Sequence, residues 1–215
     1  MEPIKSIVFF GDSLTAGSNS RRRFTHYLED ALVGNVIYNF AVSGTTIGEY
    51  SIYPVDGESL LSQIAKHKES IISATDIFIE YGSNDVSAVM CGFATVQTVT
   101  VSLVKAIDWI NQLNPNARII FLVPGSDSVI YAKSVEMCHY LEHDYFKQFD
   151  FSFPDTLYCE TYKKIIQNVS IICDTMYMFD DGMLDSKYLS DDGIHPNDSG
   201  HYRIAQNILS QYNRA

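Results

Sequence analysis

The stretch Ile7-Val8-Phe9-Phe10-Gly11-Asp12-Ser13-Leu14 places a serine just after a continuous apolar run. A run of this kind, without polar alternation, is typical of a strand buried on both faces of a parallel sheet. A serine at the exit of such a strand can be held rigidly and still face solvent, as a nucleophile requires. The stretch therefore predicts a buried parallel strand and a candidate nucleophile, Ser13.

Four further apolar runs resemble the first, and helical periodicity fills the intervals between them. The expected strands are Ile4–Phe10, Val36–Phe40, Asp76–Tyr81, Arg118–Val123 and Ser170–Cys173. The expected helices are Arg22–Leu32, Leu60–His67, Val96–Asn111 and His201–Tyr212. Alternation of strands and helices is typical of a doubly wound α/β domain. At a length of 215 residues, positions 1–215 are expected to form a single domain.

One interval, at about residues 125–169, is longer than the others and rich in aromatic side chains. Two apolar stripes at helical spacing predict two helices there, a helical insertion before the last strand. The stripes are Val135, Cys138, Leu141, Tyr145 and Phe149, then Tyr158, Tyr162, Ile165 and Val169. Insertions after strand ends lie at the ligand crevice, which favours a lid or substrate wall. The alternative is that the second helix is a plain crossover helix packed on the sheet.

Composition and charge argue against several classes of partner. Lysine and arginine total 15 and aspartate and glutamate total 26, so the formal net charge is −11. Such a surface repels polyanions, so neither nucleic acid nor a strongly anionic membrane is an expected partner. No apolar run approaches the ~20 residues of a membrane span. No basic segment followed by an apolar run marks a secretory signal, so a cytoplasmic location is expected.

Three more polar motifs follow the first: Ser43-Gly44, Gly82-Ser83-Asn84-Asp85 and Asp192-Gly193-Ile194-His195-Pro196. His195 is the candidate general base, because the imidazole pKa lies near the working pH. Asp192 lies three residues earlier, and the glycine between them allows a tight turn. In such a turn the carboxylate can accept the histidine Nδ1–H and fix the tautomer.

The oxyanion that forms when a serine attacks an ester needs preorganised donors. The candidates are the backbone N–H groups of Ser13 and Gly44 and the side-chain amide of Asn84. All three lie just beyond predicted strand ends, and therefore at one rim of the sheet. With the nucleophile, base and acid, they provide the parts of a serine esterase. Asp12 and Asp85, which adjoin these positions, are expected to brace loops by accepting backbone N–H groups.

The sequence resembles the SGNH hydrolases, also called GDSL esterases and lipases. The four sequence blocks of that family are matched, in order, by the motifs that contain Ser13, Gly44, Asn84 and His195. Asp192 resembles the acid of that family in its Asp-x-x-His-Pro setting, and the blocks span nearly the whole chain. The resemblance implies a flavodoxin-like, three-layer α/β/α sandwich with a five-stranded parallel sheet. It also implies hydrolysis of a small-molecule carboxylic ester without a metal or other cofactor.

The expected activity is removal of a short acyl group, acetate first, from a carbohydrate or other small alcohol through an acyl-enzyme. The main alternative is a lysophospholipase or thioesterase acting on longer acyl chains, which the aromatic insertion favours. A non-catalytic carbohydrate-binding module on the same fold is a second alternative. A third is a metal-dependent hydrolase, because His139-Tyr140-Leu141-Glu142-His143 matches a metallopeptidase pattern and Glu160 could add a ligand.

Overall fold

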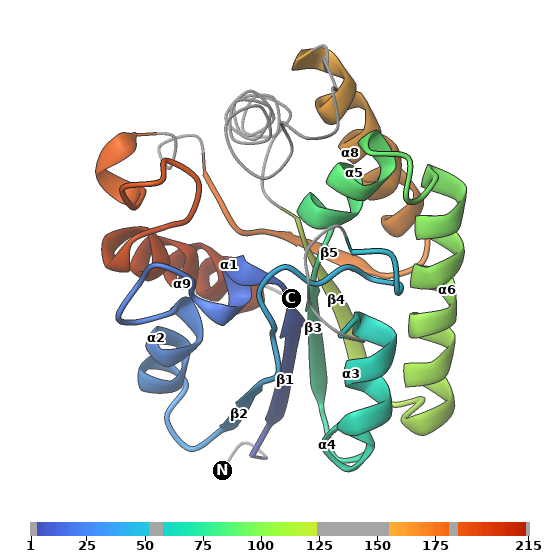
Figure 1. The fold of residues 1–215 in the computed structure, drawn as a ribbon. Coiled ribbons are helices and arrows are strands. Elements are labelled where there is room, and N and C mark those ends of the chain that lie inside the picture. The colour runs from blue at the N-terminus through green and yellow to red at the C-terminus, as the bar shows by residue number, and fades with distance from the viewer. Residues whose placement is uncertain (1–3, 52–57, 124–154, 181–184, 214–215) are drawn as a thin grey trace.

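The computed structural model describes residues 4–51, 58–123, 155–180 and 185–213. Its strands form one five-stranded sheet in the order β2-β1-β3-β4-β5, and every pairing is parallel (Figure 1). The strands are β1 (Ser6–Gly11), β2 (Val36–Asn39), β3 (Asp76–Glu80), β4 (Arg118–Val123) and β5 (Asp174–Tyr177). From β1 the chain winds first to β2 on one side and then to β3 on the other. Doubly wound sheets form their ligand crevice at this switch point.

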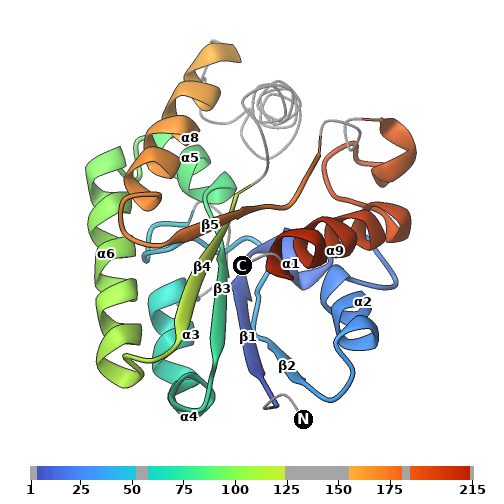
Figure 2. The same ribbon diagram turned by 180° about the vertical axis from the view of Figure 1, so that it is seen from behind.

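Helices cover both faces of the sheet (Figures 1 and 2). On one face lie α3 (Leu60–Lys66), α4 (Lys68–Ile72), α5 (Ser83–Met90), α6 (Val96–Leu113) and α8 (Asp155–Val169). On the other face lie α1 (Ser13–Ala16), α2 (Phe24–Ala31) and α9 (Asp198–Tyr212), with the 3₁₀ helix η3 (Ser186–Tyr188) before α9. The predicted three-layer α/β/α sandwich with five parallel strands is confirmed.

Successive residues of the central strands point to opposite faces and divide the core into two hydrophobic clusters. In β1, Val8 and Phe10 join the cluster beneath α3 and α6, whereas Ile7 and Phe9 join the cluster beneath α2 and α9. Phe9 stacks on Phe78 of β3, with ring centroids 4.6 Å apart. Burial on both faces explains why these strands are continuous apolar runs in the sequence.

Most predicted elements agree with the structure within about two residues, the usual uncertainty of element ends. The fifth predicted strand, Ser170–Cys173, is wrong. The backbone N–H groups of Ile172 and Cys173 donate to the carbonyl of Val169 at 2.9 and 3.2 Å, so this segment is the turn that ends α8. The actual strand, β5, is an edge strand in which only Met176 is buried, so it has no apolar run to mark it.

Helix α8 corresponds to the second predicted helix of the insertion. Its residues Tyr162, Ile165 and Val169 lie in the hydrophobic cluster over the sheet, and the helix packs against α5 and α6. This packing favours the alternative of a crossover helix between β4 and β5. The first predicted helix, with His139 and His143, lies outside the residues that the structure describes.

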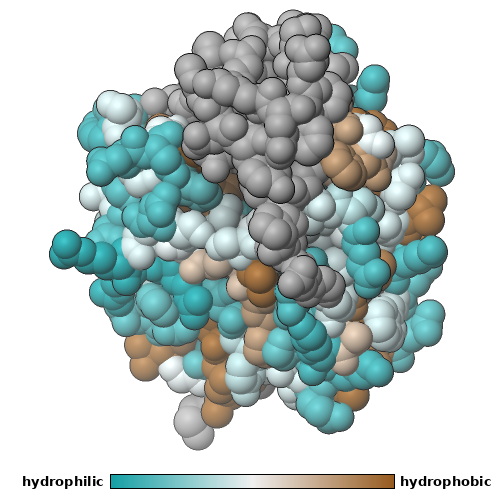
Figure 3. Space-filling view, viewed as in Figure 1, coloured by the Kyte–Doolittle hydropathy of each residue, from teal (hydrophilic) through white to brown (hydrophobic). Residues whose placement is uncertain are grey.

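The surface viewed in Figure 3 mixes hydrophilic residues with separate hydrophobic patches. Val33 and Ile171 are the most exposed large apolar side chains of the described ranges, and they lie in two different turns. None of the helices that the structure describes is long and apolar enough to cross a bilayer.

Candidate active site

Ser13 is the first residue of α1, immediately beyond β1. Asp12 caps this helix, because its Oδ1 accepts the backbone N–H of Leu14 at 3.0 Å. The N–H groups in the first turn of a helix have no partner within the helix. Ser13 therefore brings both its hydroxyl and its backbone N–H to the carboxyl end of the sheet.

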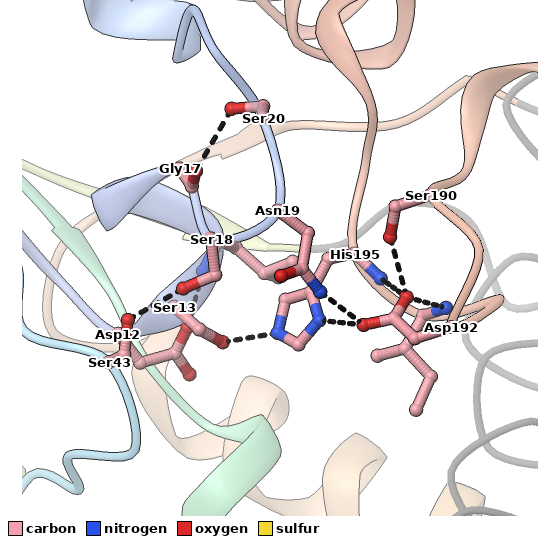
Figure 4. A network of polar contacts seen from close by, with 12 residues as sticks. Asp12, Ser13, Gly17, Ser18, Asn19, Ser20, Ser43, Ser190, Asp192 and His195 are labelled. Carbon is pink, nitrogen blue, oxygen red and sulfur yellow. Dashed lines mark hydrogen bonds and ion pairs between the residues drawn. The ribbon is translucent and has the colours of Figure 1, made fainter.

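The side chains of Ser13, His195 and Asp192 form a continuous chain of hydrogen bonds (Figure 4). The Oγ of Ser13 lies 2.9 Å from Nε2 of His195, and Nδ1 of His195 lies 2.6 Å from Oδ2 of Asp192. A histidine that donates from Nδ1 to the carboxylate has Nε2 free to accept the serine proton. The three predicted triad residues are thus brought together, from segments 182 positions apart.

Asp192 lies in a tight turn, residues 190–195, called here the triad turn. Its Oδ1 accepts the backbone N–H groups of Ile194 and His195 at 2.9 and 3.0 Å and the hydroxyl of Ser190 at 2.7 Å. Gly193 has a φ of +71°, a left-handed conformation that glycine adopts without strain. The turn therefore fixes the carboxylate and the histidine backbone relative to each other.

The donors around Asp192 also set its charge. Partial burial raises its pKa, but hydrogen bonds from His195, Ser190 and the backbone outweigh that effect and hold the pKa well below its usual range. The side chain of Asn19 adds a hydrogen bond of 2.7 Å to Oδ2, the oxygen that faces the imidazole. Asp192 is therefore an anion that can orient the neutral histidine and stabilise its protonated form.

The oxyanion candidates lie around Ser13 and are linked through Asn84. The amide nitrogen of Asn84, in α5, donates to the carbonyl of Thr45 at 2.9 Å and to Oδ2 of Asp12 at 3.2 Å. It thus joins the residue that precedes Ser13 to the residue that follows Gly44. Both N–H groups of this amide are engaged, so donation to an oxyanion requires one of the two bonds to break. The bond to Asp12 is the longer one.

Three carboxyl groups are buried beneath these donors, those of Asp12, Glu80 and Asp85, called here the acid floor. Burial raises the pKa of Glu80, and burial together with the charge of Glu80 raises the pKa of Asp12 well above its usual value. Burial likewise raises the pKa of Asp85 to about 7. The acid floor therefore favours protonated carboxyl groups, the opposite of the triad turn.

The predicted bracing roles of Asp12 and Asp85 are confirmed. Asp12 accepts a backbone N–H within its own turn, and Oδ1 of Asp85 accepts the backbone N–H of Ile47 at 3.0 Å and the hydroxyl of Tyr50 at 2.8 Å. The other oxygen of Asp85 is buried and has no hydrogen-bond partner in the described part of the chain. Burial of an oxygen without a hydrogen-bond partner costs less free energy in a neutral carboxylic acid than in a carboxylate.

Three further residues that were not predicted from the sequence shape the site: Asn19, Ser190 and Glu80. Asn19 carries a weak signal, because asparagine tolerates the left-handed backbone conformation that it has here, with a φ of 62°. Glu80 carries a stronger one, because it is an ionisable residue inside the otherwise apolar run from Ile77 to Tyr81. A charged side chain inside a buried strand indicates a polar partner.

The metal alternative gains no support from the residues that the structure describes. Among them, no three His, Cys, Asp or Glu side chains are grouped so that they could hold an ion. Glu160, the suggested further ligand, is exposed on α8. The pair His139 and His143 lies outside the described ranges, so this alternative stays a prediction.

Solved structures with the same fold include several esterases and lipases. A protein from Lactobacillus plantarum is 18% identical, with a TM-score of 0.67 over 100% of this chain and 99% of its own. A lipase from a goat rumen metagenome is 13% identical, with a TM-score of 0.60 over 95% of each chain. An acetylxylan esterase from Geobacillus stearothermophilus is 18% identical, with a TM-score of 0.55 over 98% of this chain and 96% of its own.

A search of curated proteins found no match. One family model does match, over residues 9–203, and this range includes all four sequence blocks. The chain belongs to the GDSL-like Lipase/Acylhydrolase family of ester hydrolases.

Proposed function

We propose that the chain is a serine esterase that hydrolyses carboxylic esters through an acyl-enzyme. The observation that carries the proposal is the chain of hydrogen bonds from Ser13 through His195 to Asp192, with contacts of 2.9 and 2.6 Å. A serine hydroxyl becomes a useful nucleophile when a base lies within hydrogen-bond reach and a third group orients that base. Both conditions hold in this geometry.

In the first half of the reaction, Oγ of Ser13 attacks the carbonyl carbon of the ester and its proton moves to Nε2 of His195. Asp192 stabilises the imidazolium that results. The oxyanion accepts hydrogen bonds from the backbone N–H groups of Ser13 and Gly44 and from the side-chain amide of Asn84. When the tetrahedral intermediate collapses, the bond to the alcohol oxygen breaks and the leaving alkoxide takes the proton from His195.

In the second half, a water molecule attacks the acyl-enzyme and gives its proton to His195. The second tetrahedral intermediate collapses with release of the carboxylic acid, and the proton on His195 returns to Oγ of Ser13. No redox change or external cofactor is needed for this cycle. Overall, one ester and one water are consumed, and one carboxylic acid and one alcohol are released.

The substrate we propose is a short acyl ester, acetate first, of a carbohydrate or another small polar alcohol. Polar side chains surround the described part of the site, including Ser18 and Ser43, whose hydroxyls are 2.6 Å apart, and Asn19 and Ser190. Such a rim suits an alcohol rich in hydroxyl groups. The acetylxylan esterase among the proteins of similar fold is consistent with this choice.

The first test compares the wild type with Ser13→Ala on p-nitrophenyl acetate, in the presence of a chelator. We expect kcat/KM to fall by at least ~10⁴-fold in the variant. Ser20→Ala is the matched control, because Ser20 lies in the same loop and its hydroxyl, within the described ranges, bonds only to the carbonyl of Gly17. Equal turnover by wild type and Ser13→Ala would overturn the serine mechanism. Wild-type turnover that is seen without chelator and lost when chelator is added would support the metal-dependent alternative.

A series of p-nitrophenyl esters of increasing acyl length tests the substrate class. We expect acetate to have the highest kcat/KM and acetylated xylo-oligosaccharides to release acetate. A maximum at long acyl chains would instead support the lysophospholipase or thioesterase alternative. Binding of acetylated sugars by both wild type and Ser13→Ala, without turnover by either, would support a binding module.

A further inference from the structure

Asp12 and Glu80 stand side by side at the carboxyl ends of two adjacent strands. The register of β1 and β3 pairs Gly11 with Glu80, so Asp12 is the next residue beyond that pair. Oε2 of Glu80 accepts the hydroxyl of Thr15 at 3.0 Å and the backbone N–H of Asp12 at 3.4 Å. Both side chains are only 1% exposed, and the charge of Glu80 is close enough to raise the pKa of Asp12. Two carboxyl groups this close can share a hydrogen bond when one of them holds a proton.

The ionisable groups that face this pair come from every element packed around it. Asp85 faces it from α5 and Tyr81 from the end of β3, and both add negative charge if they ionise. His195 faces it from the triad turn, and a positive charge on this histidine lowers the pKa of Asp12. Two buried carboxyl groups in contact cannot both ionise, so the pair keeps one proton at neutral pH.

We propose that Asp12 keeps this proton, uses it to donate a hydrogen bond to Glu80, and as a neutral acid lets Asn84 turn its N–H to the oxyanion. Asp12 is then a positioning residue that acts through Asn84, and the inference rests on the proposed esterase function. Each carboxyl group has two donors in this structure, Thr15 and a backbone N–H for Glu80, and Leu14 and Asn84 for Asp12. Once Asn84 turns to the oxyanion, Asp12 keeps the N–H of Leu14 alone among the described donors and lies against the charge of Glu80, so we place the proton on Asp12.

The neutral state of Asp12 matters for two reasons. A hydrogen bond to a carboxylate is roughly twice as strong as one to a neutral oxygen, so an ionised Asp12 would retain Asn84. An ionised Asp12 would also place a negative charge next to the developing oxyanion, and the burial of Asp12 leaves little water to screen that charge. Both effects raise the barrier for attack, and neither changes how the substrate docks.

The decisive variant is Glu80→Gln. The glutamine amide still accepts from Thr15 and now donates to Asp12, which removes the competing charge and stabilises the Asp12 carboxylate. We expect kcat on p-nitrophenyl acetate to fall by about 10²-fold, the effect of losing one oxyanion donor, with KM nearly unchanged. Full activity of this variant across neutral and alkaline pH would overturn the proposal.

The double variant Asp12→Asn/Glu80→Gln separates electrostatics from structural damage. Asparagine at position 12 imitates a neutral acid, so we expect the double variant to recover kcat to within about 3-fold of Asp12→Asn alone. Damage to packing would instead accumulate and leave the double variant slower than Glu80→Gln. We also expect Asp12→Asn to keep its activity at alkaline pH, where the wild type loses the shared proton and slows.

Infrared spectroscopy reports the proton even if the variants are poorly active. At about pH 8 we expect the wild type to show the carbonyl band of a buried protonated carboxylic acid, and Asp12→Asn to lack that component. This measurement uses no substrate, so it stays informative if Ser13→Ala shows that the chain is not a serine esterase. An unchanged band in Asp12→Asn would place the proton elsewhere and overturn the proposal.

Discussion

The triad turn and the acid floor flank the same serine and give the same type of residue opposite properties. Asp192, in the triad turn, is partly exposed and receives hydrogen bonds from four residues, Asn19, Ser190, Ile194 and His195. Asp12, in the acid floor, is buried against a second carboxyl group. The pKa of Asp192 is lowered, whereas the pKa of Asp12 is raised.

The difference shows that the balance of burial, like charge and hydrogen-bond donors, rather than distance from the nucleophile, decides which carboxyl group is charged. Donors stabilise the charged form of Asp192 more than partial burial destabilises it. In the acid floor, burial and a like charge outweigh the few donors present. In the proposed mechanism, a negative charge on Asp192 thus faces the imidazolium, whereas Asp12, beside the oxyanion, stays neutral. Variants that change one region at a time test this contrast.

The largest effect is expected for Asp192→Asn in the triad turn. The asparagine oxygen can still accept from the backbone of Ile194 and His195, but its amide donates to Nδ1 and favours the wrong histidine tautomer. We expect kcat on p-nitrophenyl acetate to fall by about 10³- to 10⁴-fold. Asp191→Asn is the control, because it removes one exposed negative charge from the same turn. Equal losses in both variants would mean that net charge, and not tautomer control, is what Asp192 supplies.

The next largest effect is expected for Asn84→Ala, which removes the donor that joins the two strand-end loops. We expect kcat to fall by about 10²- to 10³-fold while KM changes little, as for other oxyanion donors. The bonds from Asn84 to Thr45 and Asp12 also contribute to stability, so the melting temperature should fall as well. A lower melting temperature with unchanged kcat would show that Asn84 only braces the loops.

The fold was largely predictable because its central strands are buried on both faces. Burial of this kind produces the apolar runs that mark β1, β3 and β4, and it places Ser13 at a strand end. The edge strand β5 was not predictable in this way, since half-exposed edge residues give no run. The apolar residues that suggested a strand, Ile171 and Ile172, lie instead in the turn before β5.

The candidate site was predictable where a local spacing carries the geometry, as in the three residues from Asp192 to His195. The contacts of Glu80 with Asp12 and Thr15 were not, because they depend on the register of two strands that are distant in sequence. The engagement of Asn84 with two acceptors likewise follows from tertiary packing alone.

A smaller effect, on stability rather than turnover, is expected for Asp85→Asn in the acid floor. The folded-state pKa of Asp85, about 7, lies above its ordinary value of 3.8, so folding favours the protonated form. The stability that this group contributes is present in acid and is lost as pH rises through about 7. Asparagine keeps the bonds to Ile47 and Tyr50 and carries no charge.

We therefore expect the melting temperature of the wild type to fall more than that of Asp85→Asn between about pH 5 and about pH 8. Asp108→Asn, which alters an exposed carboxyl on α6, should follow the wild type. Thermal unfolding followed by circular dichroism at several pH values measures the difference. Parallel curves for wild type and Asp85→Asn would contradict the raised pKa of this group.

The smallest effect is expected for Gly193→Ala, which tests whether the triad turn owes its geometry to its backbone. Gly193 has a φ of +71° and no atom within 4 Å of an added Cβ, so the substitution brings only backbone strain, worth ~1 kcal/mol. Gly34, in the turn before β2, has a φ of +92° and equally open surroundings. Gly34→Ala should thus lower the free energy of unfolding by a similar amount.

The two glycines differ in whether their turns contain residues of the active site. A shift of the backbone at Gly193 moves Asp192 relative to His195, whereas a shift at Gly34 moves no residue of the site. We expect kcat to fall by about 3-fold in Gly193→Ala and to stay unchanged in Gly34→Ala, at equal loss of stability in urea. Equal kcat in the two variants would mean that the donors on Asp192 hold the turn whatever its backbone conformation. The hydrogen bonds, and not the glycine, would then set the geometry of the triad turn.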